Sequence, residues 1–553
     1  MQNLKTKLVG TAAVIGLAVA FAASANATPT RFLYAGGATF PEKQYRDLMN
    51  CYGDHSGTDT ETGLTSHICS TGDSGFTAPY NADIQLLYAG VGSGNGKKAL
   101  WNHDAGATGL TSGGRVPDSV PVPSTADQGP HYGTATGAAW AATKSTANPF
   151  ATISYIGSDD PLLASDLTTA GQYNDHSAAN NWGPAIAVPS FVGAVGIGYS
   201  PATGTWVEKG KKPSGAIGAF NLVSLKTNTW CGIMTGAITD WNNAEITADN
   251  GGVSITGGVS KPITVVYRSD GSGTTFIFAN AFIHQCDQST HPIPASWESA
   301  VKTGGSAPNT NVPGQSNNNW FLNIAGAGLL PTTFVGQPGN GGIHDYITAV
   351  GHEGSVGYLS TDFLKPVDST GPRAMNLQTY ATFVNALAPV FKQPNTKTAA
   401  AIMASAAPPL FTAASCTTNT TYNPGTSPDG ICAHNPVNWG ATNPTPLSTA
   451  AYPIGGFTFH MMYSCYNPAG LTDVNALVSN TAGALGWFRW FYGSPTQNLS
   501  LVKNSLAKNG FGPIPGKWSS GVKKLLFSDV KTKIGIPGQA KTACSGLTAT
   551  GGA

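Results

Sequence analysis

The chain has 553 residues and a formal net charge of +1, and only 10% of its residues are charged. Single hydrophobic cores stop growing at roughly 250–300 residues, so this length predicts two lobes, with or without insertions. The balanced charge and the lack of a basic stripe argue against a nucleic-acid-binding protein. Glycine (69) and proline (37) are abundant. Because so few residues are charged, we expect a polar surface built mainly from Ser, Thr, Asn and Gly.

The N-terminus has the composition of an export signal. Lys5 and Lys7 form a positively charged start, Leu8 to Ala23 form an apolar stretch, and Ala25-Asn26-Ala27 is a small-x-small cleavage pattern. A membrane anchor is the alternative, but the apolar run is short for a bilayer span. We therefore expect residues 1–27 to be a cleaved signal peptide. No Cys follows the cut to carry a lipid, so we expect a soluble protein that is periplasmic or secreted.

Five short apolar runs predict buried strands. Three of them lead through a Gly-rich turn into a segment with helical periodicity, which indicates an α/β fold. After the first strand, Pro41 is expected at the first helical position, and Tyr45, Leu48, Met49 and Tyr52 then form one apolar face. The predicted strands are Arg31–Ala35, Ile84–Tyr88, Ile153–Ile156, Val195–Tyr199 and Ile263–Tyr267, and the turns are Gly36 to Phe40, Gly92 to Gly94 and Arg268 to Thr274.

Three polar stretches lack apolar periodicity and look like insertions in this pattern. They run from Gly53 to Ala78, from Thr108 to Pro149 and from Ser405 to Pro446. Ordered loops tied by disulfides and mobile surface segments are both compatible with their composition.

Eight cysteines in an exported chain favour disulfides over free thiols. Eight cysteines allow about 105 connectivities, and the spacings favour pairing between sequence neighbours. A zinc site is the alternative, but no CxxC pair or nearby His couple supports it. The expected pairs are Cys51–Cys69, Cys231–Cys286, Cys416–Cys432 and Cys465–Cys544.

The Gly-rich turns have the chemistry of anion receptors. A helix N-terminus presents unpaired N–H groups and the positive end of the peptide dipoles. Glycine lets an oxyanion approach that backbone closely, and Ser and Thr hydroxyls add donors. Any one such turn could simply cap its helix, but several that converge on one cleft would enclose phosphate or sulfate.

The segment from Arg268 to Thr274 makes this interpretation more specific. The planar guanidinium of Arg268 fits two oxyanion oxygens at once, and Asp270 could hold it in place. Ser272, Gly273 and Thr274 then offer hydroxyl and amide donors at a helix start. An ordinary surface ion pair between Arg268 and Asp270 is the alternative.

Several motifs resemble PstS-type periplasmic phosphate-binding proteins of ABC uptake systems. Tyr267 to Phe278 looks like that family's signature, and Gly36 to Pro41 resembles its N-terminal turn. Gly92 to Gly94 is similar to its second turn, and Tyr155 to Leu162 to its segment with a buried aspartate. Weaker similarities lie at Cys231 to Trp241, Gly354 to Tyr358 and Gly510 to Pro515, so the motifs follow the family's order from about residue 31 to 530.

The resemblance implies a set of ligands for the phosphate. Asp270 would orient Arg268, and Asp159 is favoured over its neighbour Asp160 because it follows Ser158 and precedes Pro161 by two residues, as in the family. No catalytic residue, metal ligand or cofactor is expected. The implied phosphate ligands are Thr39, Phe40, Ser93, Asp159, Arg268, Ser272, Gly273 and Thr274.

The resemblance also implies the fold and the function. The expected fold is a two-lobed type II periplasmic-binding-protein fold, α/β in class, with a mixed sheet in each lobe and long loop insertions. Lobe 1 would comprise residues 28–190 and 452–553, and lobe 2 residues 191–451. The protein would capture inorganic phosphate between the lobes for an ABC permease, as a monomer that binds no nucleic acid.

An aspartate in an anion site implies selection by protonation state. Phosphate near neutral pH still has a proton that it can donate to Asp159, whereas sulfate has none and would be repelled by the carboxylate. Two alternatives remain open: a secreted phosphatase or phosphate-ester hydrolase on the same fold, and an adhesive surface or matrix protein.

Overall fold

A computed structural model describes most of the chain. The predicted signal peptide, the insertion at 108–149, and the insertion at 53–78 apart from Gly53 lie outside the described residues. Those residues are 31–53, 80–102 without 82 and 91, 154–163, 166–167, 183–201, 223–303, 318–412 without 366 and 369, 430–440, 443–466, 474–493 without 482–483, and 503–545 without 537.

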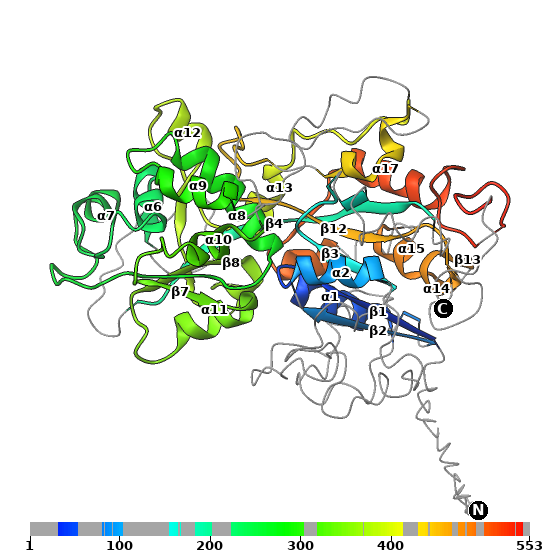
Figure 1. The fold of residues 1–553 in the computed structure, drawn as a ribbon, viewed down its shortest axis with the longest axis horizontal. Coiled ribbons are helices and arrows are strands. Elements are labelled where there is room, and N and C mark those ends of the chain that lie inside the picture. Colours follow the sequence, from blue (N-terminus) through cyan, green and yellow to red (C-terminus); the bar gives the residue numbers. More distant parts are fainter. Residues whose placement is uncertain are drawn as a thin grey trace, which may run out of the picture.

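The molecule has two lobes joined near its middle (Figure 1). One main sheet runs through both lobes in the order β2-β1-β3-β12-β4-β8-β6-β7, and short strands β9 and β15 also pair with β4. Its strands are β1 (Arg31–Gly37), β2 (Ile84–Gly90), β3 (Tyr155–Ser158), β4 (Ala185–Tyr199), β6 (Thr264–Arg268), β7 (Phe334–Gln337), β8 (Ser355–Ser360), β9 (Arg373–Ala374), β12 (Gly455–Tyr463) and β15 (Gly512–Pro513).

The part of the main sheet in each lobe contains both parallel and antiparallel pairs, as the resemblance implies. In the first lobe β1 is parallel to β2 and β3, and β12 is antiparallel to β3 and β4. In the second lobe β6 is parallel to β7 and β8, and β8 is antiparallel to β4. Two small sheets add β5 (Ser224–Leu225), β10 (Asn376–Gln378), β11 (Phe391–Lys392), β13 (Asn480–Thr481) and β14 (Ala484–Leu485).

Strand β4 connects the lobes and is longer than the predicted Val195–Tyr199. Nine of its first ten residues pair with β12 and its last five with β8, and all fifteen are buried. Pro189 and three glycines obscure the strand in the sequence. The sheet accommodates Pro189 beside a bulge, because Pro189 pairs with Phe459 while the next pair is Phe191 with Thr458.

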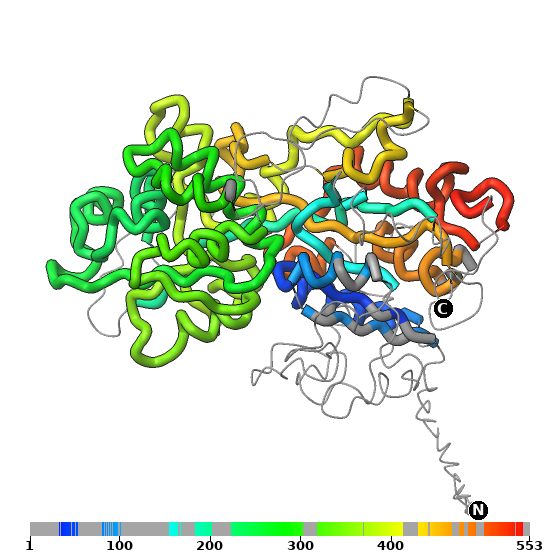
Figure 2. The backbone as a smooth tube through the Cα atoms, in the orientation of Figure 1, coloured from blue at the N-terminus to red at the C-terminus, as the bar shows by residue number. Residues whose placement is uncertain are grey.

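The helices pack around the sheets (Figure 2), and four of them begin shortly after the parallel strands β1, β2, β6 and β7. Among the described residues, no helix has the length and apolar character needed to cross a membrane. The helices are α1 (Glu42–Tyr52), α2 (Ser93–Asn102), α6 (Thr227–Met234), α7 (Ala244–Asp249), α8 (Gly273–Cys286), α9 (Ala295–Thr303), α10 (Trp320–Gly326), α11 (Gly339–Thr348), α12 (Tyr380–Val384), α13 (Thr396–Ile402), α14 (Val474–Val478), α15 (Trp487–Phe491) and α17 (Gly516–Phe527).

The first helix follows its predicted pattern, with one difference at its start. The predicted face of Tyr45, Leu48, Met49 and Tyr52 is buried, because it packs on the first sheet. Pro41 caps α1 rather than occupying its first helical position, so the helix begins one residue later than predicted.

Part of the third polar stretch is ordered and belongs to the core. Residues Cys432–His434 and Pro436–Trp439 form two short 3-10 helices, and the fully buried Trp439 ring lies 6.1 Å from the Trp518 ring. The low apolar content of the stretch hides this, although Ala433 and Val437 are buried in the core together with Trp439.

Two predicted disulfides are confirmed. Cys231 is bonded to Cys286, which ties α6 to the end of α8, and Cys465 is bonded to Cys544 near the C-terminus. Cys51 and Cys432 are also disulfide-bonded. Their predicted partners, Cys69 and Cys416, lie outside the described residues.

Candidate functional site

The Arg268 segment folds into a compact group at the start of α8. Arg268 is the last residue of β6 and only 1% exposed, and the chain turns immediately into α8. Its Nε donates to Asp270 Oδ1 at 2.7 Å and its Nη2 to Asp270 Oδ2 at 2.5 Å. Ser272 caps α8, because its hydroxyl accepts from the Thr275 N–H at 3.1 Å. The carboxylate therefore fixes the guanidinium plane, and the first N–H groups of α8 have no carbonyl partner within the helix.

Ser93 and Asp159, from the other lobe, lie directly against the start of α8. Ser93 begins α2, and its hydroxyl accepts from the Asp159 N–H at 3.2 Å. At Gly273 a Cβ atom would clash with the Ser93 hydroxyl and lie 2.6 Å from Asp159 Cβ, so only glycine fits there. Ser93, Asp159 and Gly273 thus meet at one point between the lobes.

The Asp159 carboxyl has an unusual environment. It is 1% exposed, and neither of its oxygens has a hydrogen-bond partner among the described residues. Burial raises the pKa of Asp159 well above the usual value, and the Asp160 and Asp362 carboxyls raise it further. The Thr458 hydroxyl and the Arg268 guanidinium lower the pKa in part, and the Thr458 hydroxyl itself donates to the Ser158 carbonyl. Buried polar atoms are normally hydrogen-bonded, so an unpaired carboxyl beside a guanidinium indicates a place for a ligand.

Thr39 approaches the same point from the end of β1. Its Oγ1 accepts from the backbone N–H of Asn340 at 3.3 Å and from the Asn340 side-chain Nδ2 at 3.2 Å. The same Nδ2 donates to Thr274 Oγ1 at 3.2 Å, and Arg268 Nη1 donates to Thr274 Oγ1 at 3.3 Å. Asn340 therefore joins Thr39 of the first lobe to Thr274 of the second.

This hydrogen-bonding pattern decides how the two threonine hydroxyls can act. A hydroxyl has two acceptor lone pairs and one donor hydrogen. At both Thr39 and Thr274 the two lone pairs already accept hydrogen bonds, so each hydroxyl can only donate to a ligand. Two committed donors, a fixed guanidinium and several helix starts can bind unprotonated oxygens, and the Asp159 carboxyl beside them can accept a proton.

Phe40 contributes its backbone rather than its ring to this region. The ring is fully buried, lies 5.4 Å from the Phe511 ring and fills the space above Gly193. Its N–H, just before α1, makes no hydrogen bond with another described residue. All eight residues predicted to bind phosphate therefore lie around one junction between the lobes.

Comparison with known proteins places the chain in a family. A model of the PBP superfamily domain matches residues 25–494. The chain belongs to the PBP superfamily. It is 26% identical over 525 residues to "Alkaline phosphatase L" of Pseudomonas aeruginosa, which covers 93% of this chain and 94% of that protein. It is 28% identical over 209 residues to "Phosphate-binding protein PstS" of Xylella fastidiosa, which covers 38% of this chain and 40% of that protein.

Solved structures agree with the fold. A high-affinity periplasmic phosphate-binding protein, PfluDING, matches with a TM-score of 0.51 and 21% identity, over 91% of this chain and 96% of the other. The type II binding-protein fold expected from the sequence is therefore confirmed for this PBP superfamily member, and so is its resemblance to PstS-type proteins.

In this PBP superfamily chain the adjacent carboxyls Asp159 and Asp160 have different environments. Asp160 Oδ2 accepts from Lys97 Nζ at 2.9 Å and from Asn318 Nδ2 at 2.9 Å. Lys97 is also bound by Asp166 Oδ2 at 3.1 Å, and this ion cluster is almost fully buried. Asp160 therefore anchors the turn, whereas the Asp159 carboxyl is left facing the junction.

Asn340 is the residue of this site that the sequence interpretation missed. It lies at the start of α11 and is fully buried, and its Oδ1 accepts from the Ser360 N–H at 3.2 Å. A signal was present, because Gly339 to Gly342 is a Gly-rich segment that forms the first turn of α11 just after β7. The four-residue strand β7 is too short to have suggested a fourth strand-turn-helix unit.

Proposed function

We propose that this chain is an extracytoplasmic solute-binding protein that captures inorganic phosphate between its two lobes for uptake by an ABC permease. The observation that carries the proposal is the buried, unpaired Asp159 carboxyl opposite the Arg268 guanidinium. A dianion with one remaining proton fits this pairing, because it can donate the proton to Asp159 and offer its other oxygens to Arg268 and the two threonine hydroxyls.

The proposed ligand set follows from the same geometry. Arg268 would bind two oxygens through its outer edge while Asp270 holds its orientation. The hydroxyls of Thr39, Ser93, Ser272 and Thr274 and the amides of Thr39, Phe40 and Gly273 would surround the remaining oxygens. Asn340 would complete the set as a positioning residue, which directs two of these hydroxyls toward the phosphate.

Closure of the lobes would follow from ligand binding. In the proposed division, residues 28–190 and 452–553 form lobe 1 and residues 191–451 form lobe 2. Thr39, Ser93 and Asp159 then belong to one lobe and the Arg268 segment to the other, so a phosphate held by both stabilises the closed arrangement. The proposed location is the periplasm or the exterior, after cleavage of a signal peptide, with the protein acting as a monomer.

Hydrolysis of phosphate esters is a second candidate function, because the relative that covers 93% of this chain is named as an alkaline phosphatase. The two candidates differ in what happens to a phosphate monoester at the site. A receptor binds free phosphate tightly and leaves esters intact, whereas a hydrolase needs an activated nucleophile and releases phosphate from them.

The test is a calorimetric titration of protein freed of phosphate, paired with an assay of 4-nitrophenyl phosphate hydrolysis. We expect saturable 1:1 binding of phosphate, much weaker binding of sulfate and no turnover. Arg268→Lys keeps the charge but removes the bidentate fork, so phosphate affinity should fall at least tenfold, while the matched Lys261→Arg control on the surface should not change it. Turnover of 4-nitrophenyl phosphate would support the hydrolase. If the protein shows neither phosphate binding nor turnover, the adhesive-protein alternative remains.

A further inference from the structure

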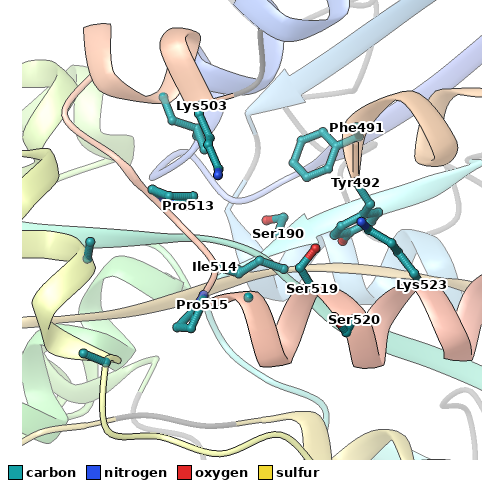
Figure 3. Close-up of a pocket in the computed structure, with 14 residues that line it drawn as sticks. Ser190, Phe491, Tyr492, Lys503, Pro513, Ile514, Pro515, Ser519, Ser520 and Lys523 are labelled. Carbon is teal, nitrogen blue, oxygen red and sulfur yellow. The ribbon is translucent and has the colours of Figure 1, made fainter. Parts of the chain in front are cut away.

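A cavity of about 590 Å³, lined mostly by residues of the first lobe, lies away from the proposed phosphate site (Figure 3). None of the eight predicted phosphate ligands lines it. Its walls come from β4, the end of α15, the segment that carries Lys503 and Leu506, the residues around β15, the start of α17 and two alanines on and just after α13. The lining residues are Ser190, Ala400, Ala404, Phe491, Tyr492, Lys503, Leu506, Pro513, Ile514, Pro515, Gly516, Ser519, Ser520 and Lys523.

Two lysines make this cavity positively charged. Lys503 and Lys523 enter from opposite sides, and both amino groups point into the space between them (Figure 3). Neither amino group forms a hydrogen bond or an ion pair with another residue in the described part of the chain. Among the described residues that line the cavity there is no Asp or Glu. Two ammonium groups that face one space without a counter-charge repel each other, and an anion between them would reverse the sign of that interaction.

Polar donors and an apolar wall complete the cavity. The Ser519 hydroxyl, in the first turn of α17, points toward the same space as the two amino groups (Figure 3). The N–H groups that begin α17 add to the positive potential there. On the other side, Phe491, Leu506 and Ile514 offer an apolar surface. A bare inorganic ion would leave most of this surface uncovered, since cavities of roughly 300–1,000 Å³ suit organic small molecules.

The phosphate site and this cavity are linked through one buried residue. Ser190 lines the cavity at the bulge of β4, and its hydroxyl lies 2.8 Å from the Tyr45 hydroxyl on α1. Helix α1 directly follows Thr39 and Phe40, so the two sites share a structural element without sharing a ligand residue.

We propose that this cavity is a second ligand site, which binds a small organic phosphate monoester. The dianionic head would lie between Lys503 and Lys523 and accept a hydrogen bond from Ser519. The apolar body would cover Phe491, Leu506 and Ile514. Two ammonium groups favour a dianion over a singly charged carboxylate of the same size, because each adds an attractive interaction with each charge.

The test uses the full mature chain saturated with inorganic phosphate, so that the first site is occupied, and phenyl phosphate as the probe. Binding is followed by calorimetry and by ligand-observed NMR. We expect one saturable site for phenyl phosphate, weaker binding of benzoate and no binding of phenol. The double variant Lys503→Met with Lys523→Met keeps the apolar stems and should weaken phenyl phosphate binding at least tenfold. The control double variant Lys531→Met with Lys533→Met changes two lysines outside the cavity and should bind normally.

Three results would overturn the proposal: no saturable binding of phenyl phosphate, equal binding by the Lys503/Lys523 double variant, or equal binding of phenol. The affinity of the first site for inorganic phosphate, measured in the same variants, should stay unchanged. That measurement separates this inference from the function proposed for the first site.

Discussion

Replacing Asp159 with asparagine should reverse the selectivity of the proposed phosphate site. In the wild-type protein a sulfate oxygen would lie next to the Asp159 carboxylate with no proton between them. At about 3 Å and an effective dielectric of about 20, that repulsion is on the order of 5 kcal/mol. Half of this value already corresponds to about a hundredfold in affinity. An asparagine amide can donate to the sulfate oxygen instead, so sulfate affinity should rise by about a hundredfold.

Phosphate should respond in the opposite direction. The variant loses the hydrogen bond from the phosphate proton to a carboxylate, and such charge-assisted bonds contribute about 1.5–3 kcal/mol, so phosphate affinity should fall at least tenfold. Calorimetric titration of both anions at pH 7.5 gives the ratio directly. Asp287→Asn is the matched control, because Asp287 caps the C-terminal end of α8, away from the proposed site, and should not alter the ratio. An unchanged phosphate-to-sulfate ratio in Asp159→Asn would refute the reasoning.

The pH dependence of sulfate binding provides an independent check on Asp159. Because burial raises its pKa well above the usual value, the carboxyl is protonated in the ligand-free protein at low pH and ionises as the pH rises. Sulfate can bind only while the proton is present, so its affinity should decrease with rising pH. In Asp159→Asn this dependence should disappear, since the amide does not titrate.

Three other predictions concern neighbouring features. Asn340→Leu removes the side-chain amide that donates to both the Thr39 and the Thr274 hydroxyl, so calorimetry should show roughly tenfold weaker phosphate binding, whereas Asn385→Leu at the C-cap of α12 should have no effect. Burial raises the pKa of Asp362 to about 8, although Lys43 opposes the shift. The stability that the protonated Asp362 contributes is present at low pH and is lost as the pH rises from 3.8 through about 8, so the melting temperature of Asp362→Asn should rise relative to wild type between pH 5 and pH 8.5. A constant difference in melting temperature would contradict the burial argument. Replacing both Cys231 and Cys286 with serine opens a loop with a sequence separation of 55 and should reduce the unfolding free energy by about 4 kcal/mol in denaturant titrations; a loss below about 1 kcal/mol would mean that the disulfide contributes little.

The parts of the site that are local in the sequence were predictable, and those that depend on long-range packing were not. Arg268, Asp270 and Ser272 lie within five residues, so a strand, a turn and a helix start suffice to bring them together. Thr39 and Asp159 could be assigned only through the family resemblance, because nothing local shows that parallel strands β1 and β3 place their ends side by side.

Other features escaped the sequence interpretation for identifiable reasons. Asn340 follows a strand of four residues, which is too short for a periodic signal. The first two thirds of β4 contain Pro189 and Gly193, which normally interrupt strands, and the bulge opposite Thr458 makes them acceptable. Trp439 lies in a stretch of low apolar content, and its ring contacts with Phe411 and Trp518 show that this stretch belongs to the core.

A crystal structure of the mature protein grown with phosphate tests the central claim most directly. The account predicts a tetrahedral ion enclosed between the lobes, within hydrogen-bond distance of the Arg268 guanidinium, the Thr39 hydroxyl and the Asp159 carboxyl. Phosphate bound elsewhere on the molecule, or no ion at this junction at a saturating concentration, would contradict it.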